Sequence, residues 1–284
     1  MIIRNLECCS VNERHKISAE VLYEDKKKDS LRVFFEVPKA FQDYLNPAYE
    51  PFLFSAFAAA LHHGEQRIKI DGDVCPEAIM NINAVMHLQK QWFKSERSIP
   101  KIEAKDEKIA YPAEGGNAGC FLSGGVDSMS NFCRNVATYT EDHPKRFKVA
   151  VFVYGLDVGD PNKPAREDIF DKTVSSLSKL TASYDCELLP LYTNARDIEK
   201  DWVFYEKKHF GSLLAGIAHS LAGKIRRCAL ALDNRVDFVC PHGSHPFLNK
   251  YFSSSYIDVE SVMDAYMRVE KYKFFKDIPE ALNA

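Results

Sequence analysis

The six residues from Ser123 to Ser128, Ser-Gly-Gly-Val-Asp-Ser, bring backbone freedom, hydroxyl groups and a carboxylate together in one short segment. Two consecutive glycines allow the backbone to curl so that successive N–H groups point into one concave site. The hydroxyl groups of the two serines add hydrogen-bond donors. Asp127 would repel a bare phosphate, so its presence favours a cation such as Mg²⁺ that bridges carboxylate and phosphate oxygens. The segment therefore predicts a site for a phosphate group that carries magnesium.

The residues on either side place this segment between a strand and a helix. An apolar run precedes it at 119–122, and apolar residues follow at Met129, Phe132, Cys133 and Val136, the spacing of one buried helix face. At such a helix N-terminus, unpaired N–H groups and the helix dipole favour an anion. The chain contains neither G-x-x-x-x-G-K-S/T nor G-x-G-x-x-G, which excludes a Walker P-loop and a dinucleotide fingerprint. The alternative is a plain turn without a ligand.

The elements after residue 119 alternate between strands and helices, which is typical of a parallel α/β sheet. The expected strands lie at 119–122, 147–157, 186–194 and 227–232. The expected helices begin after residue 125 and lie at 164–184 and 211–225, with a last helical stretch near 258–273. The long apolar run at 147–157 suits a strand that helices cover on both faces.

The first part of the chain lacks this alternation and predicts a small α+β domain. Its expected strands lie at 17–23, 31–37, 67–74 and 98–105, the first two joined as a hairpin. Its expected helices lie at 50–63, which Gly64 ends, and after Pro76. Residues 106–119 hold turn-forming residues without a period, so we expect domains at 1–110 and 111–284.

The hexapeptide resembles the PP-loop, S-G-G-x-D-S, of the ATP pyrophosphatases (adenine nucleotide alpha-hydrolase-like proteins). The resemblance covers about residues 118–270 and implies a Rossmann-like, HUP-type parallel sheet of about five strands with helices on both faces, preceded by the α+β domain. It implies that ATP is cleaved between the α- and β-phosphates. AMP becomes attached to a carbonyl oxygen of the substrate, pyrophosphate leaves, and a sulfur or nitrogen nucleophile then displaces AMP.

The resemblance also implies the roles of individual residues. The expected ATP-binding residues of the loop are Ser123, Gly124, Gly125, Val126, Asp127 and Ser128, with Asp127 as the ligand of Mg²⁺. Asp157, at the end of the second expected strand, is expected to contact the adenosine part of ATP.

Two further segments supply candidate site residues. Residues 242–255 resemble a Gly-Ser-His-Pro stretch of bacterial PP-loop proteins, which favours Gly243 and Ser244 as hydrogen-bond donors and His245 as a proton carrier. The alternative is a solvated loop. His209 and Ser212 open a helix and are also candidates, although Ser212 would serve equally as a helix cap. The run 268–271 contains two cations that could reach phosphates, but an exposed helical face is favoured there.

The nucleophile is expected to be sulfur. Residue 2 is Ile2 rather than the cysteine nucleophile of a built-in glutaminase, and no cysteine after Cys240 could form the C-terminal zinc cluster of the nitrile synthase branch. Sulfur transfer needs one thiol that can hold a persulfide. Cys120 lies three residues before the loop, and Cys240 lies in a loop near His242 and His245, which would lower its pKa. For both cysteines, a purely structural role is equally plausible.

Composition limits the partners. Net charge is −3, with 16 Lys+Arg against 17 Asp+Glu in residues 1–110 and 21 against 23 in the remainder. This even balance disfavours tRNA and favours a small acceptor such as a nucleobase, a nucleotide or a metabolite amide. The chain shows neither a long uncharged apolar window nor the apolar core of a signal peptide, so we expect a cytoplasmic protein without a membrane partner. The eight cysteines lack metal-binding spacing.

We therefore expect an enzyme that uses ATP and Mg²⁺ to adenylate a carbonyl and then transfers sulfur to give a thiocarbonyl or thioamide. The expected partners are the small acceptor, a cysteine desulfurase or another sulfur donor, and, in a homodimer, a second copy of the chain. Two alternatives remain open. One is an amide-forming ligase that uses ammonia or an amine, and the other is a non-catalytic nucleotide-binding regulator, which the intact Asp127 disfavours.

Overall fold

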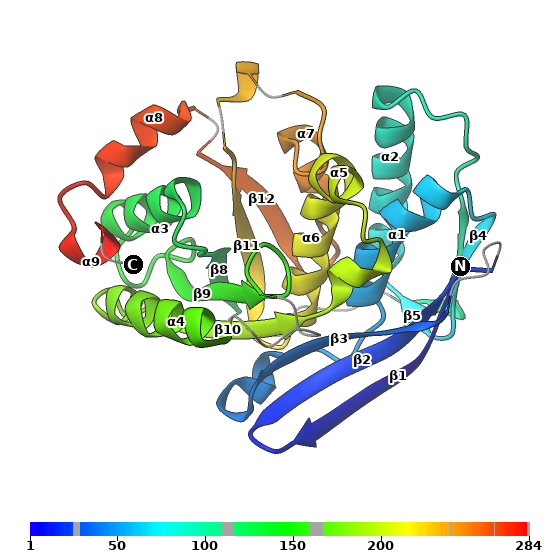
Figure 1. Cartoon of the computed structure of the whole chain (residues 1–284), viewed down its shortest axis with the longest axis horizontal. Helices are drawn as coiled ribbons and strands as arrows, with labels where there is room; N and C mark the ends of the chain where they lie inside the picture. Colours follow the sequence, from blue (N-terminus) through cyan, green and yellow to red (C-terminus); the bar gives the residue numbers. More distant parts are fainter. Residues whose placement is uncertain are drawn as a thin grey trace.

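One mixed sheet of ten strands runs through the chain, in the order β12-β11-β8-β9-β10-β3-β2-β1-β4-β6 (Figure 1). The computed structural model describes residues 1–24, 29–108, 116–159, 167–233, 235–238, 240–263 and 265–282. The α/β class is confirmed. The expected HUP-type sheet of about five parallel strands is wrong, because the sheet continues from the second half of the chain into strands of the first half.

Five strands of this sheet run parallel and belong to the second half of the chain. They are β8 (Asn117–Phe121), β9 (Phe147–Tyr154), β10 (Glu187–Thr193), β11 (Ile225–Ala231) and β12 (Asp258–Val262). The first four confirm the strands expected from the sequence. The expectation of a helix near 258–273 is wrong for β12, where β-branched residues suit pairing with β11. The helix that follows, α8 (Arg268–Lys271), has only 4 residues.

The two halves of the sheet meet where β10 pairs antiparallel with β3 (Leu31–Pro38). Side chains reinforce this pairing. Thr193 Oγ1 donates to the Phe34 carbonyl oxygen at 2.6 Å, and Asn194 Oδ1 accepts the Phe34 N–H at 3.0 Å. Without β3, the outer edge of β10 would leave a row of N–H and C=O groups unpaired. This contact joins residues that are distant in sequence, which is why the sequence does not predict it.

The N-terminal strands build the other half of the sheet. β2 (Arg14–Leu22) pairs antiparallel with β3, which confirms the expected hairpin, although residues 25–28 of the expected turn at 24–30 lie outside the described residues. The sequence does not predict β1 (Ile2–Val11), because an irregularity between Arg4 and Glu7 interrupts its alternation. The expected strand at 67–74 is divided in two. The remaining strands are β4 (Arg67–Ile70) and β6 (Lys101–Glu103), with β5 (Asp73–Val74) and β7 (Asp106–Glu107) paired in a small separate sheet.

Helices cover both faces of the parallel strands. α3 (Val126–Thr138) and α4 (Glu167–Ala182) lie on one face, and α6 (Phe210–Ser220) lies on the other with α1 (Glu50–His63) and α2 (Pro76–Trp92) (Figure 1). These helices confirm the expected ones, and Gly64 ends α1 in the left-handed conformation with φ 74°. Within the described ranges, no helix is both long enough and apolar enough to span a membrane.

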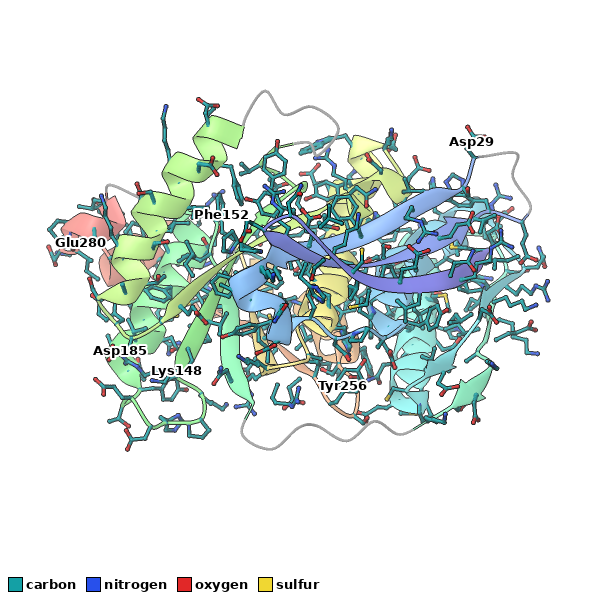
Figure 2. All side chains as sticks on the ribbon, turned by 90° about the horizontal axis from the view of Figure 1, so that it is seen from below. Asp29, Lys148, Phe152, Asp185, Tyr256 and Glu280 are labelled. Atoms are coloured by element: carbon teal, nitrogen blue, oxygen red, sulfur yellow. The ribbon has the colours of Figure 1, made fainter. Side chains whose placement is uncertain are left out.

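β9 separates two apolar cores. Ala150 and Phe152 point toward the core under α3 and α4, whereas Val149 and Val151 join the core that contains α1 and α6. This alternation follows from the two-residue period of a strand. Figure 2 shows Phe152 among the packed side chains of the interior, where its side chain is 1% exposed. The strand therefore has the buried character that its apolar run predicts.

Two histidines of the second core are completely buried. His209 Nε2 lies 2.6 Å from the Ser55 carbonyl oxygen, and His219 Nδ1 lies 2.8 Å from the Ala215 carbonyl oxygen. Burial lowers the pKa of each imidazole to about 4. Each ring is therefore neutral at pH 7 and can donate its N–H to the carbonyl oxygen.

We expect mild acid to destabilise the protein through these two histidines. The pKa of each histidine is about 4 in the folded state and near 6.5 in the unfolded state. The stability that they contribute is therefore complete above pH 6.5 and is lost as the pH falls from 6.5 toward 4. Between pH 7 and pH 5, the free energy of unfolding should fall by roughly 2 kcal/mol per histidine, measured by urea unfolding. Glu50 opposes the trend, because burial raises the pKa of its carboxyl group.

Two variants isolate this effect. His219→Gln should remove part of the pH dependence, because glutamine does not titrate. His143→Gln, at a partly exposed position, should leave the dependence unchanged. Equal pH profiles for His219→Gln and the original protein would contradict the assignment to buried imidazoles.

Candidate functional site

The Ser-Gly-Gly-Val-Asp-Ser segment forms a tight loop between β8 and α3, and Val126 is the first residue of the helix. Gly124 has a φ of 81°, which glycine adopts without strain. Ser128 Oγ donates to the Gly125 carbonyl oxygen at 3.0 Å and accepts the Ser123 N–H at 3.1 Å. Among the described residues, no side chain caps the first N–H groups of this helix of 13 residues. The loop is thus held by its own serines and leaves the helix N-terminus available to an anion.

A cavity of about 240 Å³, which we name the loop cavity, opens at the carboxyl ends of β8, β9 and β11. From β8 the chain proceeds to β9 and β10 on one side and later returns to β11 on the other. Open α/β sheets bind ligands at such a switch point. Ser123, Asp127 and Ser128 line the cavity from the loop, and Asp157 lines it from beyond β9. Its apolar wall includes Phe121, Val151, Val153, Leu156, Phe210, Leu214 and Leu230.

A second cavity of about 630 Å³, the outer cavity, adjoins the loop cavity. The two share Asp157, Phe210, Ala231 and Asp233 as walls. Most of the other side chains that line the outer cavity are aromatic or polar: Phe93, Trp202, Tyr205, Glu206, Lys207, Cys240, His242 and Ser244. Together the cavities have the size of a ligand site, which typically measures about 300–1,000 Å³. Two ligands could therefore meet at the shared wall.

A π-helical turn, Tyr205–His209, shapes the outer cavity. It lies between α5 (Trp202–Phe204) and α6, and π-helical turns often occur at functional sites. His209 and Ser212, which the sequence suggested for the site, line neither cavity: both are buried, and Ser212 Oγ donates to the His209 carbonyl oxygen at 2.8 Å. Their hydrogen bonds indicate structural roles.

Asp127 has a cationic partner that the sequence does not predict. Lys271 Nζ donates to Asp127 Oδ1 at 2.9 Å, and Arg268 Nε lies 3.4 Å from Asp127 Oδ2. Lys271 is completely buried, and its ammonium group also donates to the carbonyl oxygens of Leu232 and Asp233. All three of its N–H donors therefore have acceptors. The expectation of an exposed face at 268–271 is wrong for Lys271 and holds for Arg268, whose side chain is 62% exposed.

The carboxylate of Asp127 can coordinate a magnesium ion as its single protein ligand. Among the residues that the structure describes, no group of three His, Cys, Asp or Glu could hold a metal without help. Magnesium at phosphate sites commonly takes one or two carboxylates and completes its shell with phosphate oxygens and water. The Asp127 carboxylate fits such an ion if the exposed Arg268 side chain moves away from Asp127 Oδ2.

Asp157 lies at the wall shared by the two cavities, and Tyr205 orients it. Tyr205 OH donates to Asp157 Oδ1 at 2.8 Å. Burial and the neighbouring Asp157 carboxylate raise the pKa of Tyr205, so the hydroxyl group keeps its proton. The Arg196 guanidinium lies 4.3 Å from the centre of the Tyr205 ring and fixes its position.

The two candidate sulfur carriers lie in different environments. Cys120 is completely buried in the core under α3, on the face away from Phe121 and Val151, which line the loop cavity. Burial raises the pKa of the Cys120 thiol well above its ordinary value. Cys240 is exposed and lines the outer cavity beside His242. Of the two, only Cys240 is accessible to both a ligand and a donor protein.

The Gly-Ser-His-Pro stretch reaches the outer cavity in part. Ser244 lines it, whereas Gly243 packs so closely on the π-helical turn that a Cβ there would lie 2.7 Å from the Lys208 carbonyl carbon. His245 lines neither cavity. Its Nδ1 accepts the Phe247 N–H at 3.1 Å and caps the short helix α7 (Pro246–Asn249). Burial and the nearby His242 lower the pKa of His245.

We expect Lys271→Met to destabilise the protein, because it removes a buried ammonium group and leaves Asp127 and two carbonyl oxygens without their donor. The free energy of unfolding should fall by roughly 2–4 kcal/mol, measured by chemical denaturation. Lys273→Met, which removes an exposed ammonium group two residues away, should cost little. Equal losses in the two variants would contradict a structural role specific to Lys271.

In comparisons with known proteins, no family model, no curated protein and no solved structure matches this chain. The loop, the two adjoining cavities and the residues at their shared wall are therefore the features from which a function can be inferred.

Proposed function

We propose that this chain is a cytoplasmic, AMP-forming enzyme that binds ATP in the loop cavity. The observation that carries the proposal is the loop itself: uncapped N–H groups at the start of α3 face a cavity at the switch point of the sheet. The likeness of this loop to the PP-loop supports cleavage between the α- and β-phosphates. Its apolar wall, with Phe121 and Phe210, would cover the adenosine part.

The loop would act on the leaving pyrophosphate. Negative charge grows on this group as its bond to the α-phosphorus breaks, and N–H donors that are already oriented stabilise it without reorganisation. When bound, Mg²⁺ would neutralise phosphate charge next to Asp127. Lys271 would hold the Asp127 carboxylate in place, since its other two hydrogen bonds anchor it to the two residues that follow β11.

The outer cavity would hold the acceptor. Its shared wall with the loop cavity would allow a carbonyl oxygen of the acceptor to attack the α-phosphorus. Rigid aromatic side chains such as Trp202 and Tyr205 suit a planar, small acceptor. Pre-orientation of the two reactants lowers the entropic part of the barrier.

Sulfur transfer would use Cys240. The terminal sulfur of a persulfide on Cys240 would attack the adenylated carbon, and AMP would leave with the bonding electrons of the C–O bond. A second thiol must then attack Cys240 Sγ, which releases the thiocarbonyl and leaves Cys240 in a disulfide. Because Cys120 lies on the opposite face of β8, we assign this second thiol to the donor protein or to a small thiol.

The charge of the outer cavity favours a second candidate, an amide-forming ligase. In the part of the chain that the structure describes, Asp157, Glu206 and Asp233 line this cavity together with one lysine, Lys207. Burial lowers the pKa of His242, which favours its neutral form. An acidic cavity attracts an amine in its ammonium form and repels hydrosulfide. A nitrogen nucleophile would therefore find a more favourable electrostatic environment than a free sulfide ion.

Product analysis tests the adenylation step. With ATP, Mg²⁺ and a panel of small amides, carboxylates and nucleobases, we expect AMP and pyrophosphate, separated by ion-exchange chromatography. Asp127→Asn should lower the rate at least about 100-fold, because a charged ligand near the departing pyrophosphate is lost. Asp142→Asn, an exposed acid beyond the end of α3, is the matched control and should keep full activity. Formation of ADP and phosphate would overturn the proposal.

Cysteine variants separate the two nucleophiles. Cys240→Ser should abolish thiolation while AMP formation continues. Cys120→Ser and the exposed control Cys8→Ser should retain thiolation. Treatment with a desulfurase and cysteine should add about 32 Da, one sulfur atom, to the peptide that contains Cys240. If Cys240→Ser remains fully active and an amine is incorporated into the product, the ligase replaces the sulfurtransferase.

A further inference from the structure

A third cavity of about 240 Å³, the α3 cavity, lies between α3 and the end of β12. It shares no lining residue with the loop cavity or the outer cavity. Its helix wall is formed by Asn131, Arg134, Asn135 and Thr138, at i, i+3, i+4 and i+7. These residues form a polar stripe beside the apolar face of α3. The other walls come from Glu260–Met263 and from the segment with Tyr139, Lys145 and Phe147.

Asn131 gives this cavity an unused donor. Its side chain is 4% exposed, and within the described part of the chain Nδ2 has no hydrogen-bond partner. An amide donor buried without a partner is unfavourable, so such groups usually meet a ligand or an ordered water. The neighbouring Asn135 differs, because its Oδ1 accepts the Phe147 N–H at 2.9 Å and its Nδ2 donates to the Lys145 carbonyl oxygen at 2.9 Å. Asn135 holds the wall together, whereas Asn131 also lines the cavity and, among the described residues, keeps Nδ2 without a partner.

Positive charge also faces the α3 cavity. Arg134 lies over the rings of Tyr266 at 5.6 Å and Phe274 at 6.0 Å, and no described carboxylate forms an ion pair with it. Both rings belong to the C-terminal segment around α8. In Figure 1, α8 and the chain beyond it lie beside α3. The rings hold the guanidinium without neutralising it.

Among the described residues, one carboxylate lines the cavity, that of Glu260, and its charge is already balanced. Glu260 Oε2 lies 3.9 Å from Lys145 Nζ, and Glu260 Oε1 lies 3.9 Å from Arg227 Nε. Arg227 Nη2 also lies 3.5 Å from Asp258 Oδ2, so these two cations are balanced by two carboxylates. Among the described residues, the charge of Arg134 is additional. The amide donor and the excess positive charge favour an anion with several acceptor oxygens.

We infer that the α3 cavity binds a small oxyanion, a phosphate or carboxylate group, held by Asn131 Nδ2, Arg134 and Lys145. This site is separate from the proposed ATP site and does not depend on that proposal. The ligand would contact the same helix whose N-terminus forms the loop, so occupancy of the cavity would also stabilise α3.

Calorimetric titration with inorganic phosphate, and in a second arm with acetate, tests the inference on the full chain at constant ionic strength. Arg134→Gln changes an exposed side chain, and we expect it to weaken binding at least about tenfold, the usual scale for losing a charge-assisted hydrogen bond. Asn131→Leu should weaken it similarly while keeping side-chain volume. Lys172→Gln, on the exposed face of α4, makes the same change of charge as Arg134→Gln and should have no effect. If phosphate binds more tightly than acetate, the natural ligand carries a phosphate group. If acetate binds as tightly as phosphate, the natural ligand carries a carboxylate.

Phosphate could also bind at the loop between β8 and α3, which would give a second binding signal. Gly124→Ala separates the two signals, because alanine is strained at the positive φ of residue 124 and should disturb the loop. We expect Gly124→Ala to leave the site that depends on Arg134 intact. Unchanged affinity in Arg134→Gln, or loss of all phosphate binding in Gly124→Ala, would overturn the inference. So would Asn131→Leu with full affinity, since the buried amide would then contribute nothing.

Discussion

The ammonium group of Lys271 is completely buried, and its hydrogen bonds join three parts of the chain that are distant in sequence. It binds the first turn of α3 through Asp127, the residues after β11 through two carbonyl oxygens, and the C-terminal segment to which it belongs. A buried cation is tolerated only where oxygen atoms replace its water. The arrangement of the loop, the end of β11 and the C-terminal segment therefore depends on this one group.

The sheet supplies the frame on which this contact acts. Parallel strands bring the ends of β8, β9 and β11 to one edge, and the reversal of chain order beside β8 opens the loop cavity there. The antiparallel junction of β10 with β3 covers the far edge of the parallel strands and extends the sheet through the N-terminal half. The N-terminal helices also share one apolar core with α6, so both halves of the chain support the face on which the outer cavity lies.

The site combines two environments that suit different tasks. The loop cavity has an apolar wall and uncapped N–H groups at one end, an arrangement suited to a nucleotide with an anionic tail. The outer cavity has aromatic and acidic side chains, with Cys240 as its accessible thiol. The carboxylates favour an amine and the thiol favours sulfur, so the same cavity supports both candidate nucleophiles for separate reasons. The adenylation step that precedes them is common to both.

The sequence by itself determined the local elements and the loop. The period of apolar residues located four of the five parallel strands and the main helices, and the glycines and serines of the hexapeptide specified a strand, a turn and a helix N-terminus. These features depend on residues close together in the chain. Only the tertiary structure decided the extent of the sheet, the separation of Cys120 from the loop cavity and the cap formed by His245. Lys271 is the clearest case: nothing in its local sequence distinguishes it from the exposed Lys273, because burial and pairing depend on which distant segments pack around a side chain.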